Sequence, residues 1–296
     1  MIEGQAGLTW PRWQRIARTV EDGGFAGLYR SDHFTNPEGP YQDSLELWTS
    51  LTWLADNTER IEFGPLVSPV SFRNPVFTAR MGKDVDNLAD GRLVLGVGAG
   101  WQEREHETFG FDLLDVPERM DRFEEGVAVI DRLLGSDEPV SFDGEYFQLD
   151  DALLLPRPER DGGTRLLVGG NGRERTLPLA AARADEWNGV FLPPEEYATR
   201  NDRLDDLLAA EDRAPGDLRR SLMTQVVFGR DEDELDAVLD GRDPDELRER
   251  GILVGTGPEV AEGLDRLDDA GADRVMLQWL ALDDVDRLEG LADAVV

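Results

Sequence analysis

The stretch LVLGVGAGWQEREH, residues 93–106, decides the fold of this 296-residue chain. It joins a short apolar run to a glycine-rich turn and then to a polar segment that ends at His106. The same order occurs earlier, where the apolar run 25–29 leads into Arg30-Ser31-Asp32-His33. These are the only two histidines in the chain, and scattered core histidines have no reason to follow two strand-like runs in this way. We therefore predict that the two loops share a site that handles protons.

Outward from these loops, strand-like and helical patterns alternate along the chain. The predicted strands are residues 1–3, 25–29, 61–66, 93–97, 166–168, 186–190, 221–228 and 274–278. The predicted helices begin near residues 9, 43, 75, 117, 176, 194, 258 and 283, and a further acidic helical stretch follows the strand at 221–228. Eight strands in parallel-type alternation favour an α/β fold, the TIM (β/α)8 barrel with a shortened first strand. An open doubly wound sheet is the alternative.

One segment departs from this alternation. Residues 140–147 alternate in polarity around Asp143-Gly144, which is typical of a β-hairpin. The hairpin is predicted to be an insertion at about 137–163 in a single domain that covers residues 1–296.

The charge of the chain is extreme, with 63 acidic against 31 basic residues and a net charge of −32. Lys83 is the only lysine, and the acidic residues are spread along the whole chain. No basic stripe is available to neutralise phosphates, so neither a nucleic acid nor an anionic membrane surface is an expected partner. The composition resembles that of proteins from halophiles that accumulate salt, and it predicts that the fold requires molar salt.

Other compositional features bear on the compartment and on the chemistry. The chain has no cysteine, which excludes disulfides, thiolate metal sites and cysteine nucleophiles. No apolar run is long enough to span a membrane, and no secretion signal is recognisable at residue 1. A cytoplasmic location is therefore expected.

Two glycine-rich turns follow predicted strands. Gly96-Val97-Gly98-Ala99-Gly100 resembles a dinucleotide fingerprint, but its third glycine would fall at Trp101, so the fingerprint fails. Gly169-Gly170-Asn171-Gly172 forms the second turn. Glycines there either allow a sharp bend or let backbone amides approach a flat ring or a phosphate.

The polar residues of the two loops admit more than one interpretation. Glu103 and His106 form an E-x-x-H unit, but a di-iron site needs a second unit, so no metal site is predicted. The pair instead lies either in a pocket or at an exposed helix start. Asp32 can fix the tautomer of His33 or raise its basicity, unless Ser31-Asp32 only forms a turn.

These segments together resemble the bacterial-luciferase-like superfamily of flavin and deazaflavin oxidoreductases. The resemblance covers nearly the whole chain and is carried by the following motifs: residues 31–34, 63–69, 72–75, 91–93, 98–106, 109–110, 168–172, 184–188 and 254–256. The form Ser31-Asp32-His33 is more similar to the branch that uses the deazaflavin coenzyme F420 than to flavin enzymes.

The resemblance implies a TIM barrel with the cofactor at its mouth. It implies that His33 lies near the reactive carbon of the ring, with Asp32 beside it. It also implies a non-prolyl cis peptide near Pro65-Leu66, to within one residue, that backs the ring, so Pro65, Leu66 and Val67 are candidate cofactor-binding residues. The residues that would hold the phosphate-bearing chain belong to the two glycine-rich turns: Gly98, Ala99, Gly100, Trp101, Gly169, Gly170, Asn171 and Gly172. Arg173 and Arg175 are our candidates for the anionic tail.

Two departures from the family pattern matter. Sugar-phosphate dehydrogenases of this branch have a glutamate where this chain has Trp101, and their phosphate-binding lysines have no counterpart here. A glucose-phosphate substrate is therefore not favoured. Relatives also begin several residues earlier, so either the start is misassigned or the first strand, Met1-Ile2-Glu3, is frayed.

The resulting functional prediction is an oxidoreductase that moves a hydride between F420 and an unidentified small organic substrate. His33 is the predicted proton-handling residue, and Glu103 and His106 are further catalytic candidates on the opposite wall. Trp101, Trp187 and Trp279 either line an apolar substrate cavity or belong to the core. An FMN-dependent monooxygenase and a non-catalytic cofactor-binding protein are the alternatives, and a homodimer is expected by resemblance.

Overall fold

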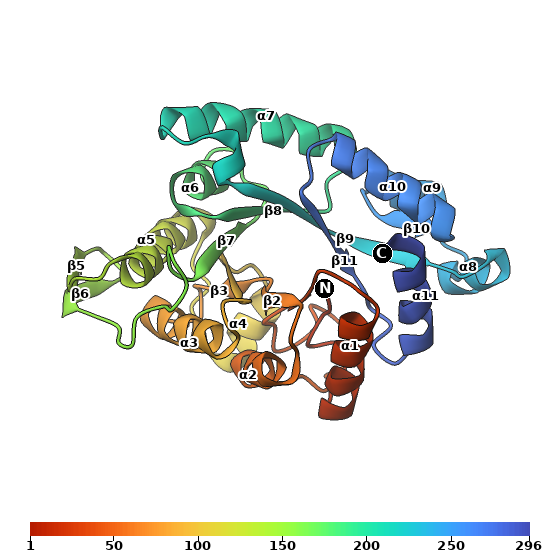
Figure 1. The fold of residues 1–296 in the computed structure, drawn as a ribbon, viewed down its shortest axis with the longest axis horizontal. Coiled ribbons are helices and arrows are strands. Elements are labelled where there is room, and N and C mark those ends of the chain that lie inside the picture. Colours follow the sequence, from red (N-terminus) through yellow and green to blue (C-terminus); the bar gives the residue numbers. More distant parts are fainter.

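A computed structural model describes residues 1–296, and its strands form a ring surrounded by helices (Figure 1). The parallel strands of the ring are β1 (Gly27–Arg30), β2 (Glu62–Pro65), β3 (Ser68–Pro69), β4 (Val94–Gly98), β7 (Arg165–Gly169), β8 (Glu186–Val190), β9 (Arg219–Phe228) and β11 (Arg274–Gln278). β1 pairs with β2, and β2 meets β4 through a bridge between Phe63 and Leu93. Pairing then continues through β4, β7, β8, β9 and β11. The predicted barrel is confirmed, and the open sheet is not the fold.

The ring closes at the first residues of the chain. Ile2 forms parallel bridges with both Arg30, at the end of β1, and Trp279, just after β11. The predicted first strand is thus reduced to one bridging residue. The short strand β10 (Leu253–Gly255), which the sequence analysis did not predict, pairs with the last residues of β9 beyond the reach of β11.

The helices form the outer layer of the barrel (Figure 1). They are α1 (Trp10–Asp22), α2 (Leu47–Asn57), α3 (Pro75–Leu88), α4 (Glu103–Phe109), α5 (Val116–Gly135), α6 (Thr176–Arg183), α7 (Pro194–Ala210), α8 (Glu232–Leu239), α9 (Pro244–Glu249), α10 (Gly257–Asp269) and α11 (Val285–Val295), with a 3₁₀ turn at Pro215–Asp217. Proline in the first turn, where its missing N–H costs nothing, starts α1, α3, α5 and α7. None of these helices is both long enough and apolar enough to cross a bilayer.

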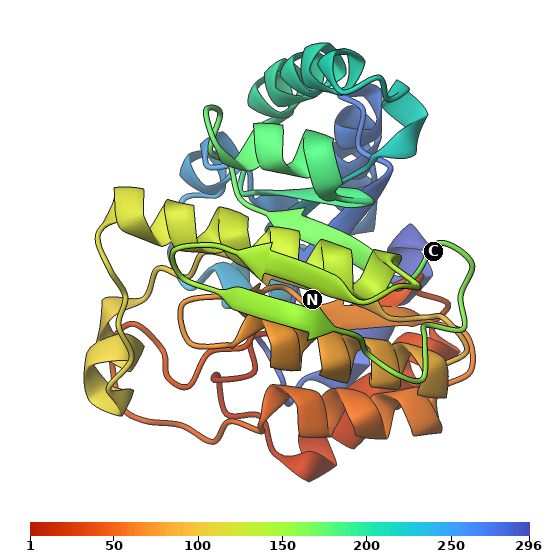
Figure 2. The ribbon, with the colours of Figure 1, turned by 90° about the vertical axis from the view of Figure 1, so that its left-hand side faces the viewer.

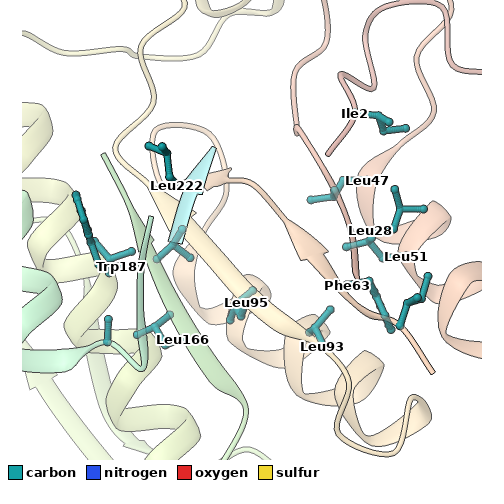
Figure 3. Close-up of a cluster of buried hydrophobic side chains, with 14 of the residues drawn as sticks. Ile2, Leu28, Leu47, Leu51, Phe63, Leu93, Leu95, Leu166, Trp187 and Leu222 are labelled. Carbon is teal, nitrogen blue, oxygen red and sulfur yellow. The ribbon is translucent and has the colours of Figure 1, made fainter. Parts of the chain in front are cut away.

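Of three apolar clusters, one packs α8, α9 and β10 against the end of β9, and the other two hold the layers of the barrel together. The larger fills the space between strands and helices, where side chains such as Leu28, Leu95 and Trp187 lie fully buried (Figure 3). The smaller lies inside the ring and consists of Tyr29, Leu66, Val94, Leu167, Met223 and Met276. Burial of this apolar surface is the main force that stabilises the barrel and so fixes the loops at its mouth.

The segment between α5 and β7 carries an antiparallel pair, β5 (Val140–Asp143) and β6 (Gln148–Ala152), which lies along α5 (Figure 2). Glu125 of α5 accepts hydrogen bonds from three backbone N–H groups of the connecting turn, at residues 145–147. One carboxylate therefore fixes the turn against the helix.

Candidate active site

The loops that follow β1 and β4 meet at the carboxyl-terminal mouth of the barrel. Glu105, on the short helix α4, accepts a hydrogen bond from the backbone N–H of Phe34 at 3.0 Å. Its other oxygen lies 2.9 Å from Nδ1 of His33. The two predicted loops are thus joined by one buried carboxylate, at the end of a barrel where active sites form.

The His33–Glu105 contact determines the electrostatics of the mouth. Burial on its own lowers the pKa of the His33 imidazole, but the hydrogen bond and the negative charge of Glu105 outweigh it. The pKa of His33 is therefore raised above its ordinary value. The side chain retains 18% exposure, and its Nε2 has no hydrogen-bond partner in the chain, so this nitrogen can exchange a proton with a bound molecule.

His106 lies on the same helix but is buried, and both of its ring nitrogens are engaged. Nδ1 lies 2.7 Å from the carbonyl oxygen of Gln102, and Nε2 lies 2.8 Å from Oγ of Ser71. A carbonyl only accepts, so Nδ1 carries a proton. The ring therefore connects α4 to the loop after β3. The third predicted catalytic residue, Glu103, is on the exposed side of α4 and makes no hydrogen bond through its side chain.

Asp32 does not contact the ring of His33, contrary to the interpretation that it fixes the tautomer. Its carboxylate accepts two hydrogen bonds from Arg73, at 2.7 and 2.9 Å, and a longer one from Ser68. Burial raises the pKa of Asp32, although Arg73 opposes that shift. Arg73 also pairs with the exposed Glu46, so these three side chains connect the end of β1 to the starts of α2 and α3.

We expect the Asp32→Asn variant to unfold with about 3 kcal/mol less free energy, because the substitution leaves the guanidinium of Arg73 poorly compensated in a buried site. The exposed pair of Arg12 and Asp283 is the matched control, since water screens a solvated ion pair and Asp283→Asn should therefore change the stability little. Urea denaturation of both variants measures the difference. Equal losses in the two variants would show that burial of the Asp32 pair has no such role.

The glycine-rich turns are shaped around Val67. A Cβ atom on Gly98 would lie 2.4 Å from Cγ2 of Val67, and one on Gly169 would lie 2.8 Å from its Cγ1. The Val67 side chain therefore sits between the ends of β4 and β7. The peptide between Leu66 and Val67 is cis, inside the stretch where the resemblance places one.

The two turns also expose backbone N–H groups. Gly100 and Gly170 have φ angles of +83° and +131°, which other residues rarely adopt. The side chain of Asn171 is held by both backbone groups of Val190, so only its backbone is free for a ligand. The N–H groups of residues 171–173 have no partner in the chain and precede the start of α6, an arrangement that suits a phosphate.

The arginines proposed for the anionic tail differ in their surroundings. Arg175 is bonded to Glu124 and Asp121, both at 2.6 Å. Arg173 is exposed and has no such partner. Arg173 is thus the cation beside this turn that remains free to meet an anionic ligand.

The three tryptophans that were predicted either to line a cavity or to belong to the core differ in their exposure to solvent. Trp187 is fully buried and stacks on Tyr197, and Trp279 is also buried, so both belong to the core. Trp101 is 58% exposed and presents an edge-to-face contact to His33, with ring centroids 5.6 Å apart.

An aromatic cluster surrounds Phe34, the residue that follows His33. It consists of Phe34, Phe72, Phe109 and Phe111, with ring centroids 4.7 to 5.6 Å apart. Phe34 and Phe109 remain partly exposed. Phe34, which follows His33 in the sequence, and Trp101, which contacts its ring, therefore offer partly open apolar surface near His33.

The sequence analysis missed Glu105 and Arg73, which hold His33 and Asp32. A signal for Glu105 was present, because Gln102, Glu105, His106 and Phe109 follow the i, i+3, i+4, i+7 spacing of one helix face. That spacing places Glu105 with His106 and turns Glu103 outward, as the structure shows. Nothing in the local sequence links Arg73 to Asp32, which are 41 residues apart.

Comparison with known proteins gives the family. Residues 2–242 match the family described as luciferase-like monooxygenase. The F420-dependent glucose-6-phosphate dehydrogenase of Kineococcus radiotolerans is 32% identical over 73% of this chain, and the match spans 64% of its own length. The 4-hydroxyprotoasukamycin monooxygenase of Streptomyces nodosus subsp. asukaensis is 30% identical over 85% of this chain and 68% of its own length.

A solved structure shares the fold over the whole chain. An F420-dependent secondary alcohol dehydrogenase, determined with an F420–acetone adduct, superposes with a TM-score of 0.82 at 21% identity and covers 100% of this chain and 99% of its own. At that identity the likeness shows the fold alone. With the family match over most of the sequence, the chain belongs to the luciferase-like monooxygenase family.

Proposed function

We propose that this protein is an F420-dependent oxidoreductase that acts on a small, uncharged organic substrate. When bound, the deazaflavin supplies the hydride or accepts it. The observation that carries the proposal is the His33–Glu105 pair, which leaves Nε2 of the partly exposed His33 without a hydrogen-bond partner in the chain. Relatives that use F420, such as the Kineococcus dehydrogenase, support the choice of cofactor.

The residues present fit a flat ring with a phosphate-bearing tail. The half-buried Val67 side chain, for which Gly98 and Gly169 leave room, would lie against the ring. The free N–H groups of residues 171–173 and the guanidinium of Arg173 would receive the phosphate and the anionic tail. In this proposal Gly98 and Gly169 act indirectly, by leaving room for Val67.

The chain's own contribution to the chemistry is proton transfer. In substrate oxidation, neutral His33 would take the hydroxyl proton at Nε2, and in reduction the imidazolium would return it. Glu105 stabilises the imidazolium and orients the ring, as the carboxylate of a catalytic dyad does. His106 and Asp32 are positioning residues in this proposal, because neither presents a free polar atom to the mouth.

The charges near the site favour an uncharged substrate. Arg104 donates to the carbonyls of Asn36 and Gly39, and Arg122 donates to those of Ser71 and Asp112. These guanidinium groups are therefore committed to the fold. The aromatic cluster and Trp101 offer apolar contact instead, which suits a neutral alcohol or ketone rather than a sugar phosphate.

Cofactor titration tests the proposal. Purified protein should quench the fluorescence of added F420 with a micromolar dissociation constant and should bind FMN at least ten times more weakly. Tight FMN binding without F420 affinity would instead identify an oxygen-activating flavin monooxygenase. Reduced F420 that stays bound but is unchanged by a panel of neutral ketones would identify a non-catalytic cofactor-binding protein.

A glycine variant tests where the ring of the cofactor binds. Gly98→Ala places a Cβ atom 2.4 Å from Val67, so Val67 must move and F420 affinity should fall by about tenfold, or 1.4 kcal/mol. Gly135→Ala is the matched control, because nothing lies within 4 Å of a Cβ atom there. Unchanged F420 affinity in Gly98→Ala would place the ring away from Val67.

Two further proposals concern the oligomeric state of the protein and the compartment in which it works. We propose that the protein works as a homodimer in a salt-rich cytoplasm, on the basis of the family resemblance and of the net charge of −32. Gel filtration in molar salt tests the assembly.

A further inference from the structure

A carboxylate that the proposed mechanism does not use lies at the mouth of the barrel. It belongs to Glu3, which directly follows Ile2, the residue that bridges Arg30 at the end of β1 to Trp279 after β11. Ile2 belongs to the core outside the ring, and successive side chains of an extended segment face opposite sides. The side chain of Glu3 therefore points to the inside of the ring.

A contact with β11 confirms this direction. Nε2 of Gln278, the last residue of β11, donates a hydrogen bond to Oε1 of Glu3 at 2.6 Å. Gln278 shares its face of β11 with Met276, which packs in the apolar core inside the ring. Gln278 stands at the carboxyl-terminal end of its strand, the end of a barrel where active sites form. Glu3 thus lies inside the mouth, and its side chain is partly exposed there.

The second oxygen of Glu3 is held by a glutamine that the loop after β1 keeps in place. Oε2 accepts a hydrogen bond from Nε2 of Gln5 at 2.8 Å. The amide of Gln5 has a defined orientation, because its Oε1 accepts from the hydroxyl of Ser31 at 2.7 Å. Gln5 and Gln278 are both buried, so the packed interior holds the two donors. The carboxylate of Glu3 is therefore fixed in one position.

The two amides orient the carboxylate of Glu3 without neutralising it. No arginine or histidine forms an ion pair with this residue. A carboxylate oxygen has about two lone-pair sites, and the chain supplies one side-chain donor to each oxygen of Glu3, so acceptor capacity remains. A charged acceptor of this kind binds an O–H group strongly and repels an anion.

Glu3 shares the mouth with His33. Ser31, whose hydroxyl orients Gln5, lies two residues before His33 in the same loop. Burial, which lowers the pKa of the His33 imidazole, and the contact with Glu105, which raises it, are the largest influences on that pKa, and the negative charge of Glu3 raises it further. A substrate whose reacting hydroxyl meets Nε2 of His33 would therefore present its neighbouring atoms to Glu3.

We infer that Glu3 is a specificity residue that accepts a hydrogen bond from a second hydroxyl group of the substrate. The inference rests on the proposed function and narrows its substrate class from simple alcohols to diols. In oxidation, the proton of the reacting hydroxyl passes to Nε2 of His33, and the hydride from the same carbon passes to bound F420, which leaves a hydroxyketone. The hydroxyl group on Glu3 keeps its proton and only binds.

Matched substrates test this inference. Propane-1,2-diol and butan-2-ol have the same reacting group and nearly the same shape, but only the diol has a second hydroxyl. Butane-1,3-diol and pentan-2-ol form a second pair, in which the two hydroxyls of the diol lie one carbon further apart. Wild type should favour the diol of at least one pair by about ten- to a hundredfold in kcat/KM, because the simple alcohol leaves the charged acceptor unpaired. Lactate, with a second carboxylate at this place, should be the poorest substrate.

A charge-removing variant links the preference to Glu3. Glu3→Gln keeps the shape of the side chain and should lower the ratio of kcat/KM between diol and simple alcohol by about tenfold. The ratio is the readout, since an effect that acts through His33 alters both substrates alike. Glu107→Gln, on the exposed side of α4, is the matched control and should leave the ratio unchanged. Circular dichroism melting of both variants reports whether they fold as wild type does.

Three outcomes would overturn the inference while the proposed function stands. The first is oxidation of the simple alcohols with no preference for either diol. The second is a diol preference that Glu3→Gln does not change, because another residue would then bind the second hydroxyl. The third is weaker F420 binding by Glu3→Gln at an unchanged ratio, which would place Glu3 against the cofactor. A wild-type protein that binds no F420, or that oxidises neither simple alcohols nor diols, would refute the proposed function and this inference with it.

Discussion

Replacing His33 with alanine should lower the turnover number by about 10²- to 10⁴-fold, the usual contribution of a positioned acid or base. The affinity for F420 should stay within a few-fold, because His33 offers the cofactor one ring among many contacts. The assay is F420-linked oxidation of a neutral secondary alcohol, followed by the change in F420 absorbance. His106→Asn is the comparison variant, since His106 has no free nitrogen and should act through positioning only.

The pH dependence of the turnover rate distinguishes a role of His33 in proton transfer from a merely structural role. Glu105→Gln removes the charge that raises the pKa of His33, so burial then dominates and that pKa should fall. The limb of the pH–rate profile that belongs to His33 should move to lower pH. With only two histidines in the chain, NMR titration of the imidazole protons follows His33 directly, and a His33→Asn variant assigns its signal.

The His33–Glu105 pair should also make the stability of the fold depend on pH. A histidine whose pKa is raised on folding stabilises the fold below its unfolded pKa, near 6.5, and that contribution disappears as the pH rises through the folded value. Wild type should therefore lose more stability than Glu105→Gln between pH 6 and pH 8. Unchanged turnover in His33→Ala would remove His33 from the mechanism, whatever the stability data show.

The predictions from sequence succeeded where a pattern is local. A helix was predicted to begin near residue 75, and α3 begins at Pro75, with Asn74 as its cap. The buried strand 186–190 is also placed correctly, since its run lies between turn residues. Both elements are specified by residues within one or two turns of themselves.

The predictions from sequence failed where a contact with a residue distant in the sequence determines the structure. β10 has only three residues and exists because β9 runs on beyond β11 and offers it an edge. Asp32 stands next to His33 in sequence, yet successive side chains leave an extended segment in different directions, and the carboxylate meets Arg73 instead. Glu105 reaches His33 across 72 residues, a contact that only the closed barrel creates.

The acidic surface should make the stability of the fold depend strongly on salt. The 31 basic residues cannot neutralise 63 carboxylates, and several arginines serve backbone carbonyls instead. Arg92 donates to the carbonyls of Ala55, Thr58 and Ala89, and Arg213 donates to those of Ala181, Ala184 and Asp217.

Carboxylates also lie close together along the chain. The first turn of α8 alone contains Glu232, Asp233 and Glu234, of which Glu234 pairs with Arg230. Repulsion among the remaining carboxylates therefore opposes the compact state.

Salt should relieve this repulsion and determine whether the protein is folded. The screening length falls from about 10 Å at 0.1 M to about 3 Å at 1 M, so carboxylates farther apart than this cease to repel one another appreciably. We expect the melting temperature to rise by at least about 10 °C between 0.1 and 2 M KCl, and much of the protein to be unfolded in salt-free buffer at 25 °C. Circular dichroism at 222 nm measures both.

A neutral co-solvent separates screening from general stabilisation. Sucrose is excluded from protein surfaces and strengthens burial without screening charge, so it should replace only a minor part of the effect of KCl. Lowering the pH from 7 to 5 in dilute buffer should act in the same direction as salt, because it protonates part of the carboxylates that repel one another. A melting temperature that is the same in salt-free buffer and in 2 M KCl would mean that the fold tolerates its charge. The acidic composition would then need an explanation other than stability.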